Sequence, residues 1–271
     1  MLYNCHVHTK HSHDSVAEPM EMCRAAAAKG LAGIAVTDHC DCEYTDRIDM
    51  YGVIEASVRD AGRCKQAFAE KLTVLQGVEV GDALFDLPFA KRLIAALPFD
   101  VVLCSVHAVR YPGFTQPFST IDFSAPDAPD PKQYLRQYFI DLYETPDLID
   151  FDILSHLTVP LRYINGKYGR NADLSPHLPQ IERILKKLIA LDKTLELNTS
   201  DAVGDAPLFM PDETVLRMYL DLGGKHFSLG SDAHVTENID RGLQAGAGLL
   251  KQLGVEEICY YEGRERITYP L

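Results

Sequence analysis

Tryptophan, positive charge and long apolar segments are scarce or missing in this 271-residue sequence. Lysine and arginine number 26 against 39 aspartates and glutamates, and the formal net charge is −13. We expect no nucleic-acid partner and no membrane partner, because both are bound by clustered Lys and Arg. No stretch approaches the ~18 consecutive apolar residues of a membrane span. The residues from Met1 to His8 lack the basic and apolar regions of a signal peptide.

Cysteine is present, but its number and placement exclude a disulfide framework. The seven residues are an odd set, scattered along the chain at Cys5, Cys23, Cys40, Cys42, Cys64, Cys104 and Cys259. This usage is typical of reduced thiols, so we expect a cytoplasmic protein. Cys40 and Cys42 form a C-x-C pair, a secondary candidate for a soft metal site because no second pair follows at zinc-ribbon spacing.

Short apolar runs alternate with longer amphipathic ones, without internal repeats or low-complexity linkers. The short runs predict buried parallel strands at Leu2–Val7, Gly33–Thr37, Leu72–Gly77, Val101–Ser105, Ile149–Ser155, Thr194–Asn198 and His226–Gly230, with a last strand at Ile258–Tyr261. The amphipathic runs predict helices at Met20–Lys29, Val53–Ala69, Phe89–Ala96, Gln133–Tyr143, Leu178–Leu191, Asp212–Leu222 and Asn238–Leu253. This alternation predicts one α/β domain over residues 1–271, either an open doubly wound sheet or a closed barrel.

The segment 110–131 fits neither pattern. It is rich in proline (Pro112, Pro117, Pro126 and Pro129) and contains several aromatic residues. Loops of this length inside a compact domain are usually functional, and Pro-Gly at 112–113 marks a turn. We therefore predict a structured, lid-like insertion at about 110–131.

Histidines and carboxylates stand where the predicted strands end. The sequences at these ends are His6-Val7-His8, Thr37-Asp38-His39, Gly77-Val78-Glu79, Ser105-Val106-His107, Ser155-His156 and Ser231-Asp232-Ala233-His234. A parallel barrel gathers the C-termini of its strands into one ring, whereas an open sheet spreads them along a line. Because six of the seven strands end this way, convergence into one site favours the barrel.

Imidazole and carboxylate are the ligands that Zn²⁺, Mn²⁺ and Fe²⁺ accept. In His6-x-His8, strand alternation places both rings on one side, and Asp232-x-His234 has the same spacing. Asp14 lies in the loop after the first strand and can bend back over the site, although His11 or His13 could replace it. The candidate ligands are His6, His8, Asp14, His39, Glu79, His107, His156, Asp232 and His234. A catalytic zinc uses about three protein ligands, so this set predicts two or three divalent ions.

These motifs, in this order, resemble those of the polymerase-and-histidinol-phosphatase (PHP) superfamily over nearly the whole chain. The resemblance implies a distorted (β/α)7 barrel, similar to a TIM barrel, with a trinuclear metal centre at the C-terminal ends of the strands. It also implies how the ligands divide among the ions. His6, His8, Glu79 and Asp232 would hold one ion, Glu79 would bridge to a second held by His107 and His156, and Asp14, His39 and His234 would bind the third.

Within the superfamily the chain is most similar to the stand-alone histidinol-phosphate phosphatases. The similarity rests on length, on the aromatic insertion after His107, on Phe151–His156 followed by Arg162-Tyr163, and on the ending Tyr260–Leu271. The sequence departs from this group at one place. Such enzymes often carry a basic residue shortly after a Glu-Leu-Asn segment, whereas this chain continues from Asn198 into the acidic stretch Asp201–Asp205. The departure bears on substrate binding rather than on the metal centre.

The resemblance implies a phosphoric monoester hydrolase of histidine biosynthesis that converts L-histidinol phosphate to L-histidinol and phosphate. Metal ions would activate a water and offset the charge of the phosphoryl oxygens. We expect Asp232 or His234 to carry the leaving-group proton. Arg162 would bind the phosphate through its guanidinium fork, or form a surface ion pair. Asn198, at the end of a strand, would orient substrate or water, or cap a turn.

Three other functions are open at this point. A phosphoesterase of the same superfamily could act on another small ester, such as a nucleotide or sugar phosphate. An amidohydrolase-type metalloenzyme also carries His-x-His after its first strand, but His107 stands where a bridging lysine would follow the fourth strand. A metal-binding module without activity is less favoured, because degenerate sites usually lose ligands and this set is complete.

Overall fold

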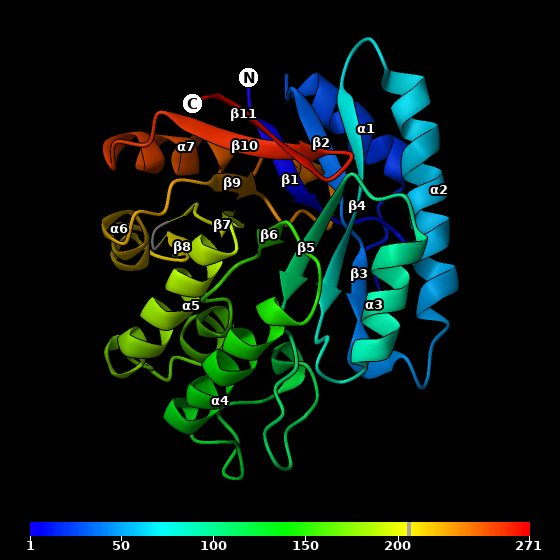
Figure 1. The fold of residues 1–271 in the computed structure, drawn as a ribbon. Coiled ribbons are helices and arrows are strands. Elements are labelled where there is room, and N and C mark those ends of the chain that lie inside the picture. The colour runs from blue at the N-terminus through cyan, green and yellow to red at the C-terminus, as the bar shows by residue number, and fades with distance from the viewer. Residues whose placement is uncertain (205–206) are drawn as a thin grey trace.

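Strands and helices alternate along the chain (Figure 1). The computed structural model describes residues 1–204 and 207–271, so Asp205 of the acidic stretch lies outside the described residues. The strands are β1 (Tyr3–Val7), β2 (Gly33–Val36), β3 (His39–Asp41), β4 (Thr73–Gly81), β5 (Val101–Ser105), β6 (Ile153–Leu154), β7 (Thr194–Asp201), β8 (Leu208–Met210), β9 (Phe227–Gly230), β10 (Glu257–Glu262) and β11 (Glu265–Pro270). The helices are α1 (Pro19–Ala28), α2 (Met50–Phe68), α3 (Leu87–Ala96), α4 (Pro131–Glu144), α5 (Leu178–Ala190), α6 (Glu213–Asp221) and α7 (Leu243–Gln252).

The parallel strands form one curled sheet. Among the described residues its seven strands follow the spatial order β1-β2-β4-β5-β6-β7-β9. β3 continues β2 after a short break, because Gly33 faces Thr73 and His39 faces Glu79 in the same register. The sheet closes where Val7 of β1 bridges Ala233, just after β9. The distorted (β/α)7 barrel predicted from the sequence is therefore confirmed.

Aspartate caps fix the starts of four helices. The side chains of Asp49, Asp86, Asp130 and Asp212 accept hydrogen bonds from the third backbone amide beyond each of them, at the beginning of α2, α3, α4 and α6. Such caps satisfy amides that have no partner within the helix. The helices accordingly begin within three residues of their predicted starts, apart from α7.

Helix α7 begins five residues later than the predicted start at Asn238. The chain first forms a short 3₁₀ turn and then passes through Gly242, whose φ of +69° lies in the left-handed region. A Cβ atom there would overlap the carbonyl oxygen of Thr199 on β7. Close approach to the barrel therefore requires glycine at this position and delays the helix.

The strands differ from the prediction at β3, which was not predicted, and at three further places. β6 covers only Ile153–Leu154 of the expected Ile149–Ser155. The short strand β8 was not predicted. It pairs antiparallel with β7, and Met210 of β8 lies opposite Asn198 of β7. The strand expected at Ile258–Tyr261 is not the last one, because β10 turns back into β11. The sequence of β11, Glu-Arg-Ile-Thr-Tyr-Pro, is only partly buried, so it lacks the apolar run by which the other strands were found.

The β10–β11 hairpin lies across the N-terminal ends of the barrel strands (Figure 1). Cys259 and Tyr261 of β10 pack against an apolar cluster made by inward residues of the strands, namely Cys5, Ala35, Leu75, Val101, Leu103 and Ile153. The Tyr261 hydroxyl lies 2.8 Å from Thr194 Oγ1, and the Tyr3 ring stacks on Tyr260 with 3.8 Å between centroids. This end of the barrel is filled, so any site must lie at the other end.

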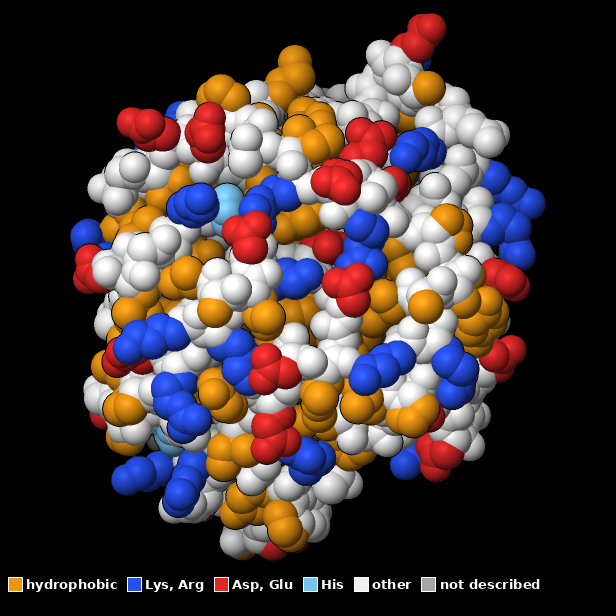
Figure 2. Space-filling model, in the orientation of Figure 1, with side chains coloured by type: hydrophobic (Ala, Val, Ile, Leu, Met, Phe, Trp, Pro, Cys, Tyr) orange, Lys and Arg blue, Asp and Glu red, His pale blue; other side chains and the backbone are white. Residues whose placement is uncertain are grey.

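The surface carries both signs of charge. On the face that Figure 2 shows, basic and acidic side chains are interspersed rather than gathered into one basic region. No helix among residues 1–204 and 207–271 combines the length and the apolar character needed to cross a membrane.

Candidate metal centre

The C-terminal ends of the strands bring the nine predicted ligands together. Asp14, His39, His107, His156, Asp232 and His234 line an open cleft, and His6, His8 and Glu79 are fully buried against them. Eight of the nine form four groups of three whose ligand atoms lie within 4.8 Å of one another: His8, His39 and His234; His6, His8 and Asp232; His6, Glu79 and His156; His39, Glu79 and His107. A fifth group joins His107 to Asp41 and Asp82. The described part of the chain thus contains several overlapping groups that could hold metal ions.

Glu79 lies at the centre of these groups, and its two carboxylate oxygens face different histidines. Oε2 is 3.3 Å from His6 Nε2 and 3.6 Å from His8 Nε2. Oε1 is 2.8 Å from His156 Nε2 and 3.4 Å from His107 Nε2. This arrangement suits a carboxylate that bridges two ions.

Asp232 and Asp14 complete the ring on the open side. Asp232 Oδ1 lies 3.2 Å from His8 Nε2 and 3.7 Å from His6 Nε2. Asp14 reaches back from its loop, with its carboxylate 3.2 Å from His234 Nε2 and 3.7 Å from His39 Nε2.

The other two histidines of that loop take different positions. His11 Nε2 pairs with Asp60 at 3.1 Å and so does not replace Asp14. His13 lines the cleft, and its ring centroid lies 5.4 Å from that of His39. The ligand position in this loop therefore falls to Asp14, with His13 beside it.

In three of the histidines the ring nitrogen that faces away from the centre is held by a protein acceptor. His6 Nδ1 lies 2.7 Å from Glu196 Oε1, and His107 Nδ1 lies 2.8 Å from Asp41 Oδ1. His8 Nδ1 contacts the Ser12 hydroxyl at 3.0 Å. Such contacts fix the tautomer and the orientation of the ring, so that Nε2 is the atom presented to a metal.

Sequence reasoning missed Glu196 and Asp41. The available signal for Glu196 was a carboxylate inside the apolar run of β7, because a buried charge requires partners. Glycines make room for both residues: a Cβ atom at Gly230 would overlap Glu196, and one at Gly81 would overlap Asp41.

Several buried polar atoms of the centre have no hydrogen-bond partner. Those that face another candidate ligand are His6 Nε2, His8 Nε2, His39 Nδ1, Glu79 Oε2 and His234 Nε2. A buried polar atom without a partner is costly, yet the first three lie 2.9 to 3.6 Å from Glu79 Oε2, and His234 Nε2 lies 3.2 Å from Asp14. Divalent cations would satisfy all of them, so the residues present fit a metal centre.

The electrostatics also suit metal ligands. Burial alone would raise the carboxyl pKa of Glu79, but His6 and His107 hold it well below its ordinary value. Burial and the nearby His39 and His234 lower the pKa of His8, which favours the neutral ring that a metal requires. The pKa of His6 is raised instead, because Glu196 and the other carboxylates outweigh its burial.

Arg162 lines the same cleft. Its Nη1 lies 3.6 Å from Asp232 Oδ2, and its Nε donates to Asp201 Oδ2 at 2.6 Å. Burial opposes its charge, but Asp232 and Asp201 raise the guanidinium pKa above the ordinary value. The predicted phosphate-binding cation is thus at the site, beside one of the candidate ligands.

Asn198 is fully buried and turns toward other protein groups. Its Oδ1 accepts hydrogen bonds from the Ser200 amide at 3.2 Å and the Ser200 hydroxyl at 2.6 Å, and its Nδ2 lies 3.4 Å from Glu196 Oε2. The residues lining the cleft do not include Asn198. This placement argues against the predicted direct contact of Asn198 with substrate.

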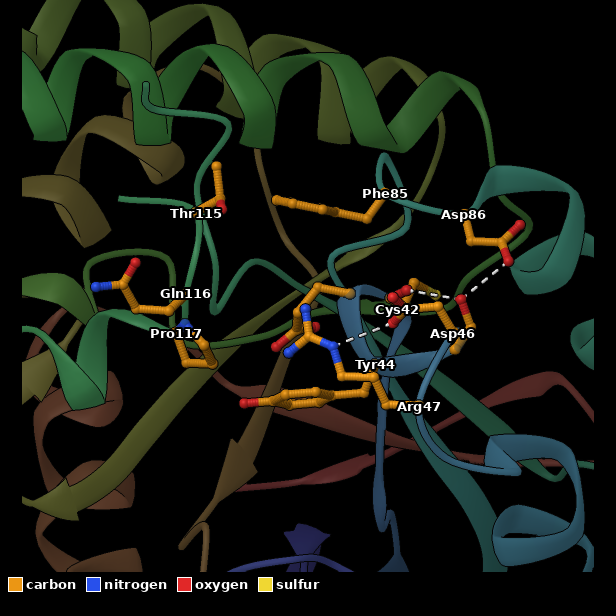
Figure 3. Close-up of a pocket in the computed structure, with 11 residues that line it drawn as sticks. Cys42, Tyr44, Asp46, Arg47, Phe85, Asp86, Thr115, Gln116 and Pro117 are labelled. Carbon is orange, nitrogen blue, oxygen red and sulfur yellow. Dashed lines mark hydrogen bonds and ion pairs between the residues drawn. The ribbon is translucent and has the colours of Figure 1, made fainter. Parts of the chain in front are cut away.

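The predicted lid segment borders the cleft through Pro117, Phe118 and Ser119. Phe118 is buried, and its amide donates to the His107 carbonyl at 2.8 Å. A neighbouring cavity of about 540 Å³ lies between Cys42–Arg47, Phe85-Asp86 and Thr115–Pro117 (Figure 3). Pro117 borders both spaces, and the Phe85 ring extends toward Thr115 in Figure 3.

The C-x-C pair does not contribute to these groups. Cys40 and Cys42 are buried, and Cys42 Sγ lies 3.9 Å from the Cys40 carbonyl oxygen. None of the candidate metal-binding groups found in residues 1–204 and 207–271 includes a cysteine. The secondary candidate for a soft metal site is therefore not supported.

Comparisons with known proteins agree with this geometry. A family model described as the PHP domain matches residues 4–200. The chain is 28% identical to a Thermotoga maritima protein named "Probable histidinol-phosphatase", over 100% of both chains. It is 26% identical to the histidinol-phosphatase of Lactococcus lactis subsp. lactis, covering 95% of this chain and 93% of that one. A crystal structure of histidinol phosphate phosphatase from Lactococcus lactis subsp. lactis, complexed with zinc, L-histidinol and phosphate, superimposes with a TM-score of 0.77 at 22% identity over 98% of both chains.

Proposed function

The chain belongs to the PHP domain family, and from this premise we propose that it hydrolyses L-histidinol phosphate to L-histidinol and inorganic phosphate. The observation that carries the proposal is the convergence of nine histidine and carboxylate side chains, six of which line a cleft that also contains Arg162. The relatives named histidinol-phosphatase, and the zinc, L-histidinol and phosphate bound in the Lactococcus lactis structure, support this choice of ester.

The centre would hold two or three divalent ions, Zn²⁺, Mn²⁺ or Fe²⁺. His6, His8, Asp232 and one oxygen of Glu79 would bind one ion, the other oxygen of Glu79 with His107 and His156 a second, and Asp14, His39 and His234 a third. The contacts of Glu79 with His6 and His156 and of Asp14 with His234 support this division, and Glu79 Oε2 also lies 2.9 Å from His39 Nδ1. When bound, such ions lower the pKa of water and offset negative charge on phosphoryl oxygens.

The remaining steps fall to side chains at the rim of the cleft. Arg162 would bind a phosphoryl oxygen through Nη1, the guanidinium nitrogen that faces Asp232. Burial works against the ionised form of Asp232, but His6 lowers its pKa well below the ordinary value, so Asp232 is held as the carboxylate that a metal ion requires. The proton lost by the attacking water would reach the leaving alcohol oxygen through Asp232 or His234, whose Nδ1 lies 3.7 Å from Asp232 Oδ1.

The alcohol portion of the substrate would extend from the cleft under the lid. Pro117 borders both the cleft and the cavity lined by Tyr44 and Phe85, and Figure 3 shows this cavity. The Tyr44 ring meets His13 edge-on, with 6.1 Å between their centroids, so the two spaces are neighbours. Residues 110–131 would act as the lid of a single domain spanning residues 1–271.

The free, buried cysteines support a cytoplasmic location.

A second candidate substrate is another small phosphate ester. It stays in the comparison because Asp201, an acidic residue, pairs with Arg162 in the stretch where the resemblance to histidinol-phosphate phosphatases leads us to expect a basic residue. The experiment below therefore includes nucleotide and sugar phosphates.

The test is phosphate release by protein loaded with Zn²⁺, Mn²⁺ or Fe²⁺. L-histidinol phosphate is compared with a nucleoside monophosphate, a sugar phosphate and an aryl phosphate. We expect L-histidinol phosphate to lead with kcat/KM of at least about 10⁴ M⁻¹s⁻¹, and Glu79→Gln to abolish turnover while the surface variant Glu182→Gln does not. If another ester leads, the substrate is wrong; if the loaded protein hydrolyses no ester, the reaction is wrong.

A further inference from the structure

The carboxylate of Asp201 faces the guanidinium of Arg162 at the edge of the cleft. Asp201 is the last residue of β7, and Arg162 begins the helical turn that follows His156. Arg162 Nε donates to Asp201 Oδ2 at 2.6 Å, and Arg162 Nη2 donates to the Ser200 hydroxyl. Two adjacent residues of one strand thus hold one edge of the guanidinium.

The other edge of the guanidinium points into the site. Nη1 lies 3.6 Å from Asp232 Oδ2, beside the candidate metal ligands. A guanidinium is planar and rigid, so fixing Nε and Nη2 also fixes the direction of Nη1. The side chain of Arg162 is only 24% exposed, so this orientation is held in a partly buried setting.

We propose that Asp201 is a positioning residue that orients Arg162 for the substrate phosphate. The inference rests on the proposed role of Arg162 in the hydrolysis of a phosphate monoester. Asp201 attracts the guanidinium from the side opposite Asp232 and so keeps it from collapsing onto Asp232, whose other oxygen faces His6 and His8. The phosphate then meets a cation whose orientation is already set, which lowers the entropy lost on binding.

The same contacts give Asn198 an indirect role. Asn198 Oδ1 accepts the Ser200 hydroxyl at 2.6 Å, and that hydroxyl oxygen accepts from Arg162. Asn198, Ser200 and Asp201 therefore form one set of connected hydrogen bonds that ends at the guanidinium of Arg162. Asp201 thus holds Arg162, the arginine among the described residues that line this cleft.

The test compares substitutions of Asp201 with a matched ion pair elsewhere. The variants are Asp201→Ala, Asp201→Asn and Asp201→Glu, with Arg162→Ala as the reference. Asp192→Asn is the control, because Asp192 pairs with Arg266 at the same 2.6 Å, on β11 at the opposite end of the barrel. Each loaded protein is measured for KM and kcat on L-histidinol phosphate, inhibition by inorganic phosphate, metal content and melting temperature.

We expect Asp201→Ala to raise both KM and the inhibition constant of phosphate about tenfold, the loss of one charge-assisted hydrogen bond. kcat and metal content should stay within about twofold, because binding to ground state and transition state weakens equally. For Asp201→Glu and Asp201→Asn we expect KM and the inhibition constant of phosphate to lie between those of Asp201→Ala and the wild type. For the control, Asp192→Asn, both constants should equal those of the wild type.

Four results would overturn the proposal, and they are distinguishable. If Arg162→Ala raises KM and the phosphate inhibition constant but Asp201→Ala does not, the positioning role is wrong and the function of Arg162 stands. If Arg162→Ala changes neither constant, the proposed phosphate contact itself is wrong. If Asp201→Ala lowers KM, Asp201 competes with the substrate for the guanidinium of Arg162. If Asp201→Ala lowers metal content and melting temperature together with kcat, Asp201 only stabilises the strand.

Discussion

The two ends of the barrel are built from the same strands but from opposite chemistry. At the N-terminal end, Cys5 of β1 packs with Tyr261 and Cys259 of the hairpin in an apolar cluster. At the C-terminal end, His6 of the same strand and His8, just beyond it, face Glu79 and its neighbours. The comparison teaches that a stabilising end and a reactive end can lie within three residues of each other along one segment.

The ends also differ in how their buried polar atoms are satisfied. The Tyr261 hydroxyl has partners in Thr194 Oγ1 at 2.8 Å and the Asp152 carbonyl at 3.3 Å. At the other end, His6 Nε2, His8 Nε2 and Glu79 Oε2 are buried without partners. We therefore expect substitutions at the hairpin to change stability and substitutions at the centre to change metal binding and activity.

The largest effect should come from Glu79→Gln. The amide cannot supply two anionic oxygens to two groups of histidines, so metal content should fall and kcat/KM should drop by about 10³-fold or more, about 4 kcal/mol. Metal analysis and steady-state kinetics check this. The melting temperature of the variant without added metal should be no lower than that of the wild type treated in the same way. A variant that keeps its metal and its activity would break the proposed bridging role.

Tyr261→Ala should produce the converse effect. Removing a buried aromatic ring that also makes hydrogen bonds is expected to cost about 3–5 kcal/mol in the free energy of unfolding. Denaturant unfolding measures the loss, and kcat at a temperature where the variant is folded should match wild type. Tyr261→Phe, which removes only the hydroxyl, should cost about 1 kcal/mol. A fall in kcat in the folded variant would show that the two ends are coupled.

Removal of metal should destabilise the wild type through the C-terminal end alone. Ions at 100 times their dissociation constant stabilise the folded state by about 2.7 kcal/mol. For a chain of this length, a chelator should then lower the melting temperature by roughly 5–10 °C. Scanning calorimetry with and without chelator checks this, and Tyr261→Ala should show the same shift from its lower starting point. An unchanged melting temperature would contradict a centre that links several strands through ions.

A smaller effect is expected at Glu196, which contacts His6 rather than the reacting groups. Glu196→Gln keeps the size of the side chain but weakens the acceptor of His6 Nδ1, so activity or metal affinity should fall about 10–100-fold. Titration with Zn²⁺ and kinetics on the same preparation separate the two. Asn198→Asp is a useful companion, because it alters the neighbour of Glu196 Oε2 without touching His6. If Glu196→Gln keeps the zinc affinity and activity of the wild type, Glu196 has no role in orienting His6.

The strand ends explain why much of this site is visible in the sequence. His6-x-His8 and Asp232-x-His234 each supply two ligands where a strand ends, and the bridge between Val7 and Ala233 brings both pairs together. Strand alternation does not account for the second pair, because it lies beyond β9 and Asp232 has a φ of +54°. The supporting residues are harder to predict, because the contact of Glu196 with His6 joins positions 190 residues apart. Asn198 shows the same limit: its place at a strand end is visible, but the partner Ser200 that turns it from the cleft is not. Gly242 and β11 were missed because overlap with Thr199 and pairing with β10 depend on the folded chain.

The central claim is that the C-terminal end of the barrel is a multinuclear metal centre bridged by Glu79. The most direct test is a crystal structure of the metal-loaded protein with anomalous diffraction at the absorption edge of the bound metal, paired with metal analysis of the same sample. The account predicts two or three ions per chain, with one on each side of the Glu79 carboxylate. A single ion, or ions bound away from Glu79, would contradict it.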